Sequence, residues 1–195
     1  MRKLIVSEFT TLDGVMQAPG GKDEDTDGGF EHGGWTLPYW HDDIGKSFFE
    51  LLDGCDAFLL GRRTYVTHAE AFEPMPEGDV FGDAMNSRHH YVVSRTLKNP
   101  VWRNTTVIRD KPIDAIRALK AQAGGSILTD GSSQLVHDML AHDLVDANRR
   151  RDGRSQRRHG CRSHWIHRLS RRWPDDGLRH QPTPAETQRQ SPQRQ

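Results

Sequence analysis

The chain has 195 residues, with 27 Lys and Arg against 27 Asp and Glu and a formal net charge of zero. This zero is a cancellation: residues 147–195 hold 13 Arg and four acidic residues, which leaves 14 basic and 23 acidic side chains in residues 1–146. Net charges of −9 and +9 in the two segments make the first a poor candidate for nucleic-acid binding. No apolar stretch reaches the roughly 18 residues of a membrane span, and two cysteines form no disulfide framework. We therefore expect a cytoplasmic protein.

Apolar runs and helix signals alternate through residues 1–146. In chain order, the predicted elements are a strand at 3–9, a loop at 18–34, a helix capped by Asp42 or Asp43 and ending near Leu52, a strand at 57–60, a helix opening at 61–64, a helix at 81–89, strands at 90–93 and 105–108, a helix from Pro112, a strand at 126–129 and a helix opening at 130–133. This order predicts one α/β domain with a mostly parallel sheet flanked by helices.

Three of the predicted strands end in small or polar turn residues, after Leu60, Val93 and Thr129. In a parallel sheet these ends line one edge, where ligands bind. Their glycines permit close backbone approach, helix N-termini offer free N–H groups, and arginines suit a phosphate. The turns therefore favour a phosphorylated dinucleotide as ligand. The candidate residues are Gly61, Arg62, Arg63, Thr64, Ser94, Arg95, Thr96, Asp130, Gly131, Ser132 and Ser133.

Each turn also has a simpler interpretation. A glycine after a strand is most often only a turn, Ser94 and Thr64 could be helix caps, and Arg62 and Arg63 could form a solvated face. A Walker-type Gly-Lys-Ser/Thr motif and a G-x-G-x-x-G motif are both absent from the sequence. The nucleotide interpretation therefore depends on three turns at successive strand ends, because no single turn is specific.

Four segments resemble the dihydrofolate reductase-like family, in the branch typified by the C-terminal reductase domain of the riboflavin-pathway deaminase/reductase. They are residues 3–14, Leu59-Leu60-Gly61-Arg62-Arg63-Thr64-Tyr65, Val92-Val93-Ser94-Arg95-Thr96-Leu97 and residues 127–145. The resemblance covers about residues 1–146. It implies a dihydrofolate reductase-like sheet and NADPH-dependent reduction of a small-molecule substrate, either a pterin- or pyrimidine-like heterocycle or a carbonyl compound, with no metal.

The resemblance also implies a role for several of the turn residues. It assigns Arg62 and Thr64 to the cofactor phosphates, Ser94 and Arg95 to the 2′-phosphate end, Gly131 and Ser132 to the pyrophosphate, and Asp13 and Gly14 to the loop near the nicotinamide.

The proton donor is the least determined role. Dihydrofolate reductases place a carboxylate early in a helix after a Leu-Pro pair, which here points to Asp43. Asp42 and Asp43 could equally cap the helix and complement its dipole. Trp35, Tyr39 and Trp40 could stack on a flat heterocycle or serve as core or lid packing.

The Arg-rich tail at 147–195 admits three interpretations. Its arginines could bind nucleic-acid phosphates with tryptophans stacking on bases, and Cys161, His164 and His167 could ligate a metal, although they lack a fourth ligand. A frameshift explains more: with suitable synonymous codons, a one-nucleotide shift of residues 150–161 spells Gly-Val-Thr-Val-Asp-Pro-Ser-Val-Val-Thr-Gly-Ala, a strand followed by a turn. Our hypothesis is a disordered frameshift product.

The frameshift hypothesis bears on function as well as on fold. It leaves a domain at 1–146 whose C-terminal strands are missing or replaced, with unpaired sheet edges that favour aggregation or pairing with a second copy as a homodimer. An alternative to the reductase is therefore a non-catalytic nucleotide-binding or interaction protein that has lost turnover through the altered C-terminus.

Overall fold

The computed structural model describes residues 1–150, without the side chains of 149 and 150, and predictions for the rest of the tail lie outside these residues. The described strands are β1 (Leu4–Glu8), β2 (Cys55–Gly61), β3 (His89–Val93), β4 (Thr105–Ile108), β5 (Ser126–Asp130) and β6 (Ala147–Arg150). The α-helices are α1 (Asp42–Asp53), α2 (Arg62–Phe72), α3 (Val80–Asn86), α4 (Pro112–Ala121) and α5 (Ser133–Ala141). Two short 3₁₀ helices, η1 (Asp27–Gly29) and η2 (Leu37–Tyr39), lie between β1 and α1.

The six described strands form one sheet in the order β4-β3-β2-β5-β1-β6, and every neighbouring pair is parallel. Parallel neighbours require crossover connections. Helices supply them except between β3 and β4, where the connection holds no helix. The α/β fold with a mostly parallel sheet is thereby confirmed.

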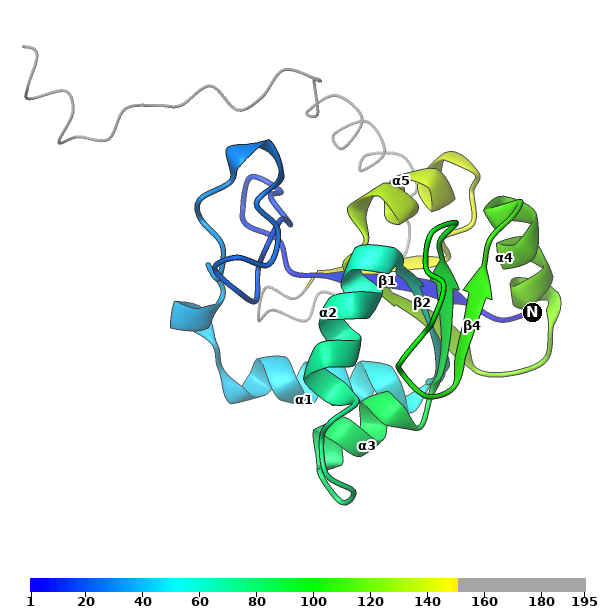
Figure 1. The fold of residues 1–195 in the computed structure, drawn as a ribbon, viewed down its shortest axis with the longest axis horizontal. Coiled ribbons are helices and arrows are strands. Elements are labelled where there is room, and N and C mark those ends of the chain that lie inside the picture. The colour runs from blue at the N-terminus through cyan, green and yellow to red at the C-terminus, as the bar shows by residue number, and fades with distance from the viewer. Residues whose placement is uncertain (151–195) are drawn as a thin grey trace, which may run out of the picture.

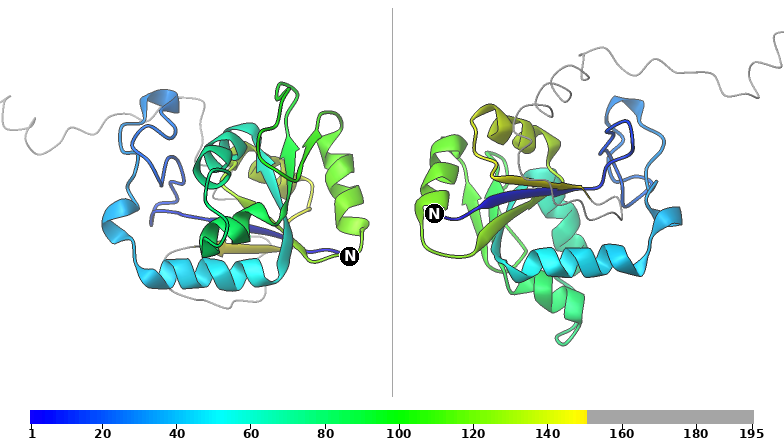
Figure 2. Two further views of the ribbon diagram at one scale, coloured as in Figure 1. Left: turned by 60° about the horizontal axis from the view of Figure 1, so that its bottom comes forward. Right: turned by 180° about the vertical axis from the view of Figure 1, so that it is seen from behind.

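Helices cover both faces of the sheet, as Figure 2 shows with α1 on one side and α4 and α5 on the other. The alternation of side chains along β2 explains this, because Phe58 and Leu60 face the core under α1, α2 and α3 while Leu59 faces the core under α4 and α5. All three side chains are fully buried. Burying a side chain of this size stabilises the fold by about 1.5–3 kcal/mol, so the run at 57–60 fixes β2 in the centre of the sheet.

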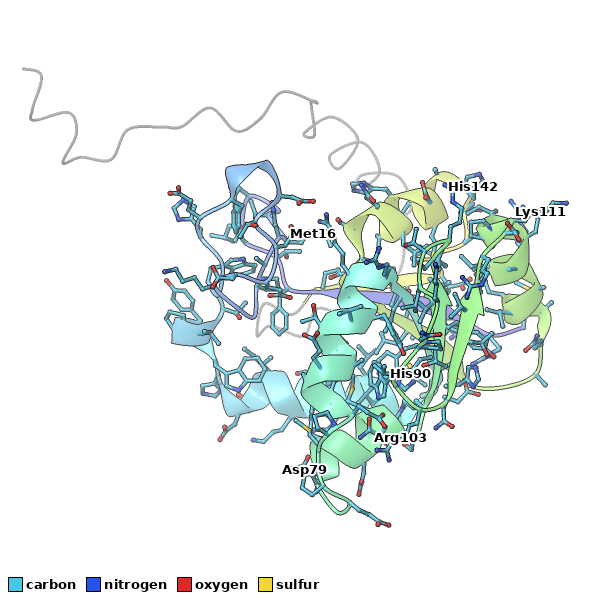
Figure 3. All side chains as sticks on the ribbon, in the orientation of Figure 1. Met16, Asp79, His90, Arg103, Lys111 and His142 are labelled. Atoms are coloured by element: carbon cyan, nitrogen blue, oxygen red, sulfur yellow. The ribbon has the colours of Figure 1, made fainter. Side chains whose placement is uncertain are left out.

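The α1-side core contains a buried imidazole, His90 on β3, which is labelled within the domain in Figure 3. Its ring stacks between Trp102 and Phe58, at centroid distances of 3.6 and 5.7 Å. The two ring nitrogens lie 3.0 and 3.1 Å from the carbonyl oxygens of Arg103 and Met85. Burial nevertheless lowers the pKa of His90 to about 4, because the loss of hydration outweighs those two carbonyls. His90 is therefore neutral in the folded protein at pH 7.

The chain between β1 and α1 lies beyond the carboxyl end of β1, in blue at the left of Figure 1. The loop predicted at 18–34 is there, and it closes on itself through the N–H of Gly34, 2.8 Å from the Ala18 carbonyl, and the indole N–H of Trp35, 2.9 Å from the Gln17 carbonyl. Trp35 therefore packs the loop. The prediction that Asp42 or Asp43 caps α1 is wrong: His41 is the N-cap, and its Nδ1 accepts from the N–H of Asp43.

Strand β6 begins at Ala147, so the sheet crosses the boundary predicted at residue 146. A contact of the buried Lys120 positions it: the ammonium donates to Asp146 Oδ2 and to the Leu144 carbonyl, each at 2.5 Å. The same Asp146 oxygen accepts from the N–H of Leu4 at 2.8 Å. Residues 144–146 are thereby tied to the start of β1, beside which β6 then runs.

Candidate functional site at the strand ends

The two central strands, β2 and β5, send the chain in opposite directions across the sheet. After β2 the chain continues through α2 and α3 to β3, and after β5 it continues through α5 past β1 to β6. In an open parallel sheet this reversal creates a crevice outside the carboxyl ends of the two strands, where ligands bind. The residues that follow β2 and β5 therefore form the leading candidate site.

The turns after β2 and β5 touch each other directly. The Ser132 hydroxyl accepts a hydrogen bond from the N–H of Gly61 at 2.8 Å and donates one to Thr64 Oγ1 at 2.9 Å. Gly131 packs equally closely, since a Cβ there would lie 2.9 Å from both Cγ2 and Oγ1 of Thr64. Its φ of +69° is also one that favours glycine. Four residues predicted from separate sequence segments thus form one cluster, which we call the strand-end cluster: Gly61, Thr64, Gly131 and Ser132.

Two helices begin at the strand-end cluster, and neither has a side-chain cap. The N-cap of α2 is Gly61, which has no side chain, and that of α5 is Ser132, whose hydroxyl does not accept from its own helix. The first N–H groups of a helix have no partner within it and carry partial positive charge. Ser132 also has a left-handed φ of +63°, a conformation that costs a non-glycine residue energy and that collects at functional turns. The cluster therefore presents N–H groups and hydroxyls suited to an anion.

The turn after β3 reaches the strand-end cluster through Arg62. Ser94 is buried, and its Oγ accepts from the N–H groups of Thr96 and Leu97 at 3.2 and 3.0 Å. It therefore caps a turn and not a helix. The Arg62 guanidinium donates to Thr96 Oγ1 at 2.9 Å. Arg95 is exposed beside Thr96. Arg62 and the Thr96 hydroxyl thus meet at the end of β3, next in the chain to the exposed Arg95, and these groups suit a phosphate.

Arg63 faces the loop between β1 and α1. Its guanidinium pairs with Asp27 and lies 3.4 Å from Asp25 Oδ1. The hydrogen bond with Asp27 raises the pKa of Arg63, so the side chain is a permanent cation. This pairing could not be predicted from the sequence, because Asp25 and Asp27 precede Arg63 by 38 and 36 positions, in the long connection between β1 and α1.

Two acidic side chains lie at the ends of the adjacent strands β1 and β5. Glu8 is 7% exposed, and its Oε2 accepts from the N–H of Gly131 at 2.9 Å. Asp130 lies with its Oδ2 3.4 Å from Nε2 of His68 on α2, and both side chains are largely buried. Asp130 was predicted as a site residue. Glu8 and His68 were missed, although an acidic residue that ends an apolar strand is a usable signal.

Asp13 and Gly14 form a local turn after β1. Gly14 has a φ of +95° and donates its N–H to the Thr11 carbonyl at 3.1 Å. The Thr11 hydroxyl donates to Asp13 Oδ1 at 2.5 Å. These contacts fix the turn locally, and none of them joins Asp13 to the strand-end cluster.

Asp43, the predicted proton donor, lies exposed in the first turn of α1. Its Oδ1 is 3.3 Å from Lys46 Nζ, and its Oδ2 is 3.4 Å from His41 Nδ1. Near it, the rings of Phe9 and Trp40 are 6.1 Å apart, and 58% of Trp40 is exposed. The catalytic role of Asp43 stays a prediction.

Neither of two open hollows near α3, of about 580 and 690 Å³, is lined by a residue of the strand-end cluster. Within residues 1–150 no group of three His, Cys, Asp or Glu side chains could hold a metal, and no helix is long and apolar enough to cross a membrane.

The family model of the RibD C-terminal domain matches residues 2–149, about three quarters of the chain. The chain belongs to the RibD C-terminal domain family. The predicted resemblance is confirmed, and the family places the chain among reductase-related domains of riboflavin biosynthesis. No protein with a curated description matches it.

Among solved structures, the fold resembles that of a Shewanella sp. PV-4 protein provisionally named as a riboflavin biosynthesis protein. The sequence identity is 20%, the TM-score is 0.52, and the match covers 76% of each chain. At this identity the likeness supports the fold alone.

Proposed function

We propose that this RibD C-terminal domain binds NADPH across the carboxyl ends of β2, β3 and β5 and reduces a small heterocycle or carbonyl compound. The observation that carries the proposal is the contact of Ser132 with Gly61 and Thr64, which joins two uncapped helix N-termini at the point where the sheet reverses direction. Arginines also follow β2 and β3 at this edge, which suits a phosphorylated organic cofactor.

The fit of a dinucleotide can be judged residue by residue. The uncapped first turn of α5 offers backbone N–H groups of the kind that a pyrophosphate requires. Arg62, Arg95 and Thr96 offer the guanidinium and hydroxyl donors that a 2′-phosphate requires. A bound nicotinamide would supply the hydride. The residues of this chain would hold the cofactor, orient the substrate and provide a proton.

The substrate side of the proposed site is the chain between β1 and α1. Phe9 and Trp40 form an aromatic pair there, and Tyr39 is 78% exposed. Exposed aromatic faces next to an acidic side chain suit a flat, nitrogen-containing heterocycle. We assign Asp43 as the proton donor to that heterocycle, in the first turn of α1.

The proposal is tested by titrating the full chain with NADPH and with NADH, followed by fluorescence. We expect Arg95→Ala to weaken the binding of NADPH by about tenfold and that of NADH by less than about twofold, because only NADPH carries the 2′-phosphate. Arg117→Ala, which removes an exposed arginine on α4, is the matched control. Equal losses for the two cofactors would refute the role of Arg95.

Measuring the oxidation of NADPH in the presence of pterins, pyrimidines and carbonyl compounds then distinguishes a reductase from a protein that only binds the cofactor. Turnover that falls in Asp43→Asn, without a change in NADPH affinity, would support the assigned donor. Binding without turnover for any substrate would favour the non-catalytic alternative. Failure to bind NADPH would refute the proposed cofactor for both the reductase and the non-catalytic nucleotide-binding protein.

A further inference from the structure

Glu8 occupies a backbone donor that the proposed cofactor site needs. It is the last residue of β1 and is 7% exposed, and its Oε2 accepts from the Gly131 N–H at 2.9 Å. Gly131 is also the residue whose close packing against Thr64 shapes the strand-end cluster. A carboxylate oxygen of the protein therefore lies where an oxygen of an anionic ligand would accept the same hydrogen bond.

A carboxylate and a phosphate oxygen cannot both take this N–H in good geometry, because one N–H forms one strong hydrogen bond. The neighbouring charges matter too. Asp130 ends the adjacent strand β5, where it lies opposite Ser7 in register and beside His68. On the other side of β1, Arg150 of β6 is the register partner of Glu8. A second acidic group thus lies at the next strand end, so the edge that would receive phosphates already carries carboxylate charge.

We propose that Glu8 is a stand-in for a phosphate oxygen: it holds the Gly131 N–H in the ligand-free domain and must release it when a dinucleotide binds. This inference rests on the proposed function. Glu8 keeps the Gly131–Ser132 turn in its left-handed conformation before the ligand arrives, which avoids a buried unsatisfied N–H. The same contact lowers affinity for every phosphate ligand, because each must displace the carboxylate.

Substituting Glu8 should therefore affect ligand binding in the opposite direction to substituting a residue that supports the site. Removing a support weakens ligand binding, whereas removing a competitor strengthens it. Glu8→Ala frees the N–H and removes the charge. Glu8→Gln keeps an acceptor of similar shape but removes the charge. We expect Glu8→Ala to bind NADP⁺ and inorganic pyrophosphate about tenfold more tightly than the wild type, as when one charge-assisted hydrogen bond need no longer be broken. Glu8→Gln should lie between the two.

The test is calorimetric titration of the full chain with NADP⁺ and with inorganic pyrophosphate, at one salt concentration, for the wild type and both variants. Glu70→Gln, which removes one exposed acidic charge from α2, controls for net charge and should match the wild type. Circular dichroism establishes that each variant is folded, and Glu8→Gln keeps the test valid if Glu8→Ala is not. Unchanged or weaker binding by the folded Glu8 variants, with a binding wild type, would overturn the inference alone. No binding of either ligand by the wild type would overturn both this inference and the proposed function.

Discussion

The side-chain oxygen of Ser132 lies 2.8 Å from the backbone nitrogen of Gly61, although 71 positions separate the two residues in the chain. The contact joins the N-cap of α5 to the N-cap of α2, and these helices cover opposite faces of the sheet. It therefore ties the two halves of the domain together at the carboxyl ends of β2 and β5. The stability of this contact and its effect on ligand binding can be measured separately.

Ser132→Ala removes the two hydrogen bonds that join the turns. We expect a loss of about 1 kcal/mol in the free energy of unfolding, because the Gly61 N–H loses its partner at a partly buried position. Ser133→Ala, one position along and exposed, should change the free energy of unfolding by less than about 0.5 kcal/mol. Urea unfolding of both variants checks this. Equal losses would mean that the serine side chains act only through helix propensity.

Asp146→Asn weakens the contact that brings β6 beside β1. The Asp146 carboxylate accepts from the buried Lys120 ammonium and from the Leu4 N–H, so its neutral amide leaves a buried cation poorly compensated. We expect a loss of about 2 kcal/mol in the free energy of unfolding. Asp114→Asn, which breaks an exposed pair with Arg117, should cost less than about 0.5 kcal/mol. A loss at position 146 as small as that at 114 would contradict the role given to the Lys120–Asp146 pair.

His90 should make the fold sensitive to mild acid. Its pKa is about 4 in the folded state, below the ordinary value of 6.5, so the unfolded chain binds the proton more tightly. The contribution of neutral His90 to the free energy of unfolding is fully present above about pH 6.5. It falls as the pH drops toward 4, by about 2 kcal/mol between pH 7 and 4.5. Phenylalanine in His90→Phe keeps the stacking with Trp102 but cannot titrate. Between pH 7 and 4.5, the free energy of unfolding of the variant should fall by about 2 kcal/mol less than that of the wild type, as measured by urea unfolding. An identical pH dependence of the two proteins would contradict the lowered pKa of His90.

The frameshift hypothesis predicts a result in the coding DNA. Read one nucleotide out of frame from the codon of Arg150 onward, the DNA should encode an apolar, strand-forming segment in place of the arginine-rich tail. Sequencing the gene and translating all frames checks this, and shifted frames without a strand-forming segment would contradict it. The first four residues of the predicted tail at 147–195 form β6 (Ala147–Arg150), and the rest of that tail lies outside the described residues.

Much of the fold could be predicted from local patterns. The apolar run at 57–60 has the hallmark of a strand covered on both faces, and Pro112 begins α4 at the position where its missing N–H costs nothing. The turns after β2 and β5 were predicted as parts of one site because parallel strands bring their carboxyl ends together. The contact of Gly61 with Ser132 follows from that topology.

The parts that could not be predicted depend on pairings between distant residues. His41 caps α1, but histidine is not among the usual capping residues, so the neighbouring aspartates appeared better candidates. The contacts of Glu8 with Gly131 and of Arg63 with Asp27 join segments whose sequence spacing carries no information about distance. Such contacts require the order of the strands in the sheet and the path of the loop after β1.

The central claim is that a dinucleotide binds where the turns after β2 and β5 meet, and calorimetric titration of Gly131→Ala with NADPH tests it most directly. A Cβ at this position would lie 2.9 Å from the Thr64 side chain, and the turn requires a left-handed φ of +69°. Gly78→Ala is the matched control, because Gly78 also has a left-handed φ, of +91°, but has open space around it. We predict that folded Gly131→Ala binds NADPH at least about tenfold more weakly than Gly78→Ala. Equal affinities of the two variants would contradict the claim.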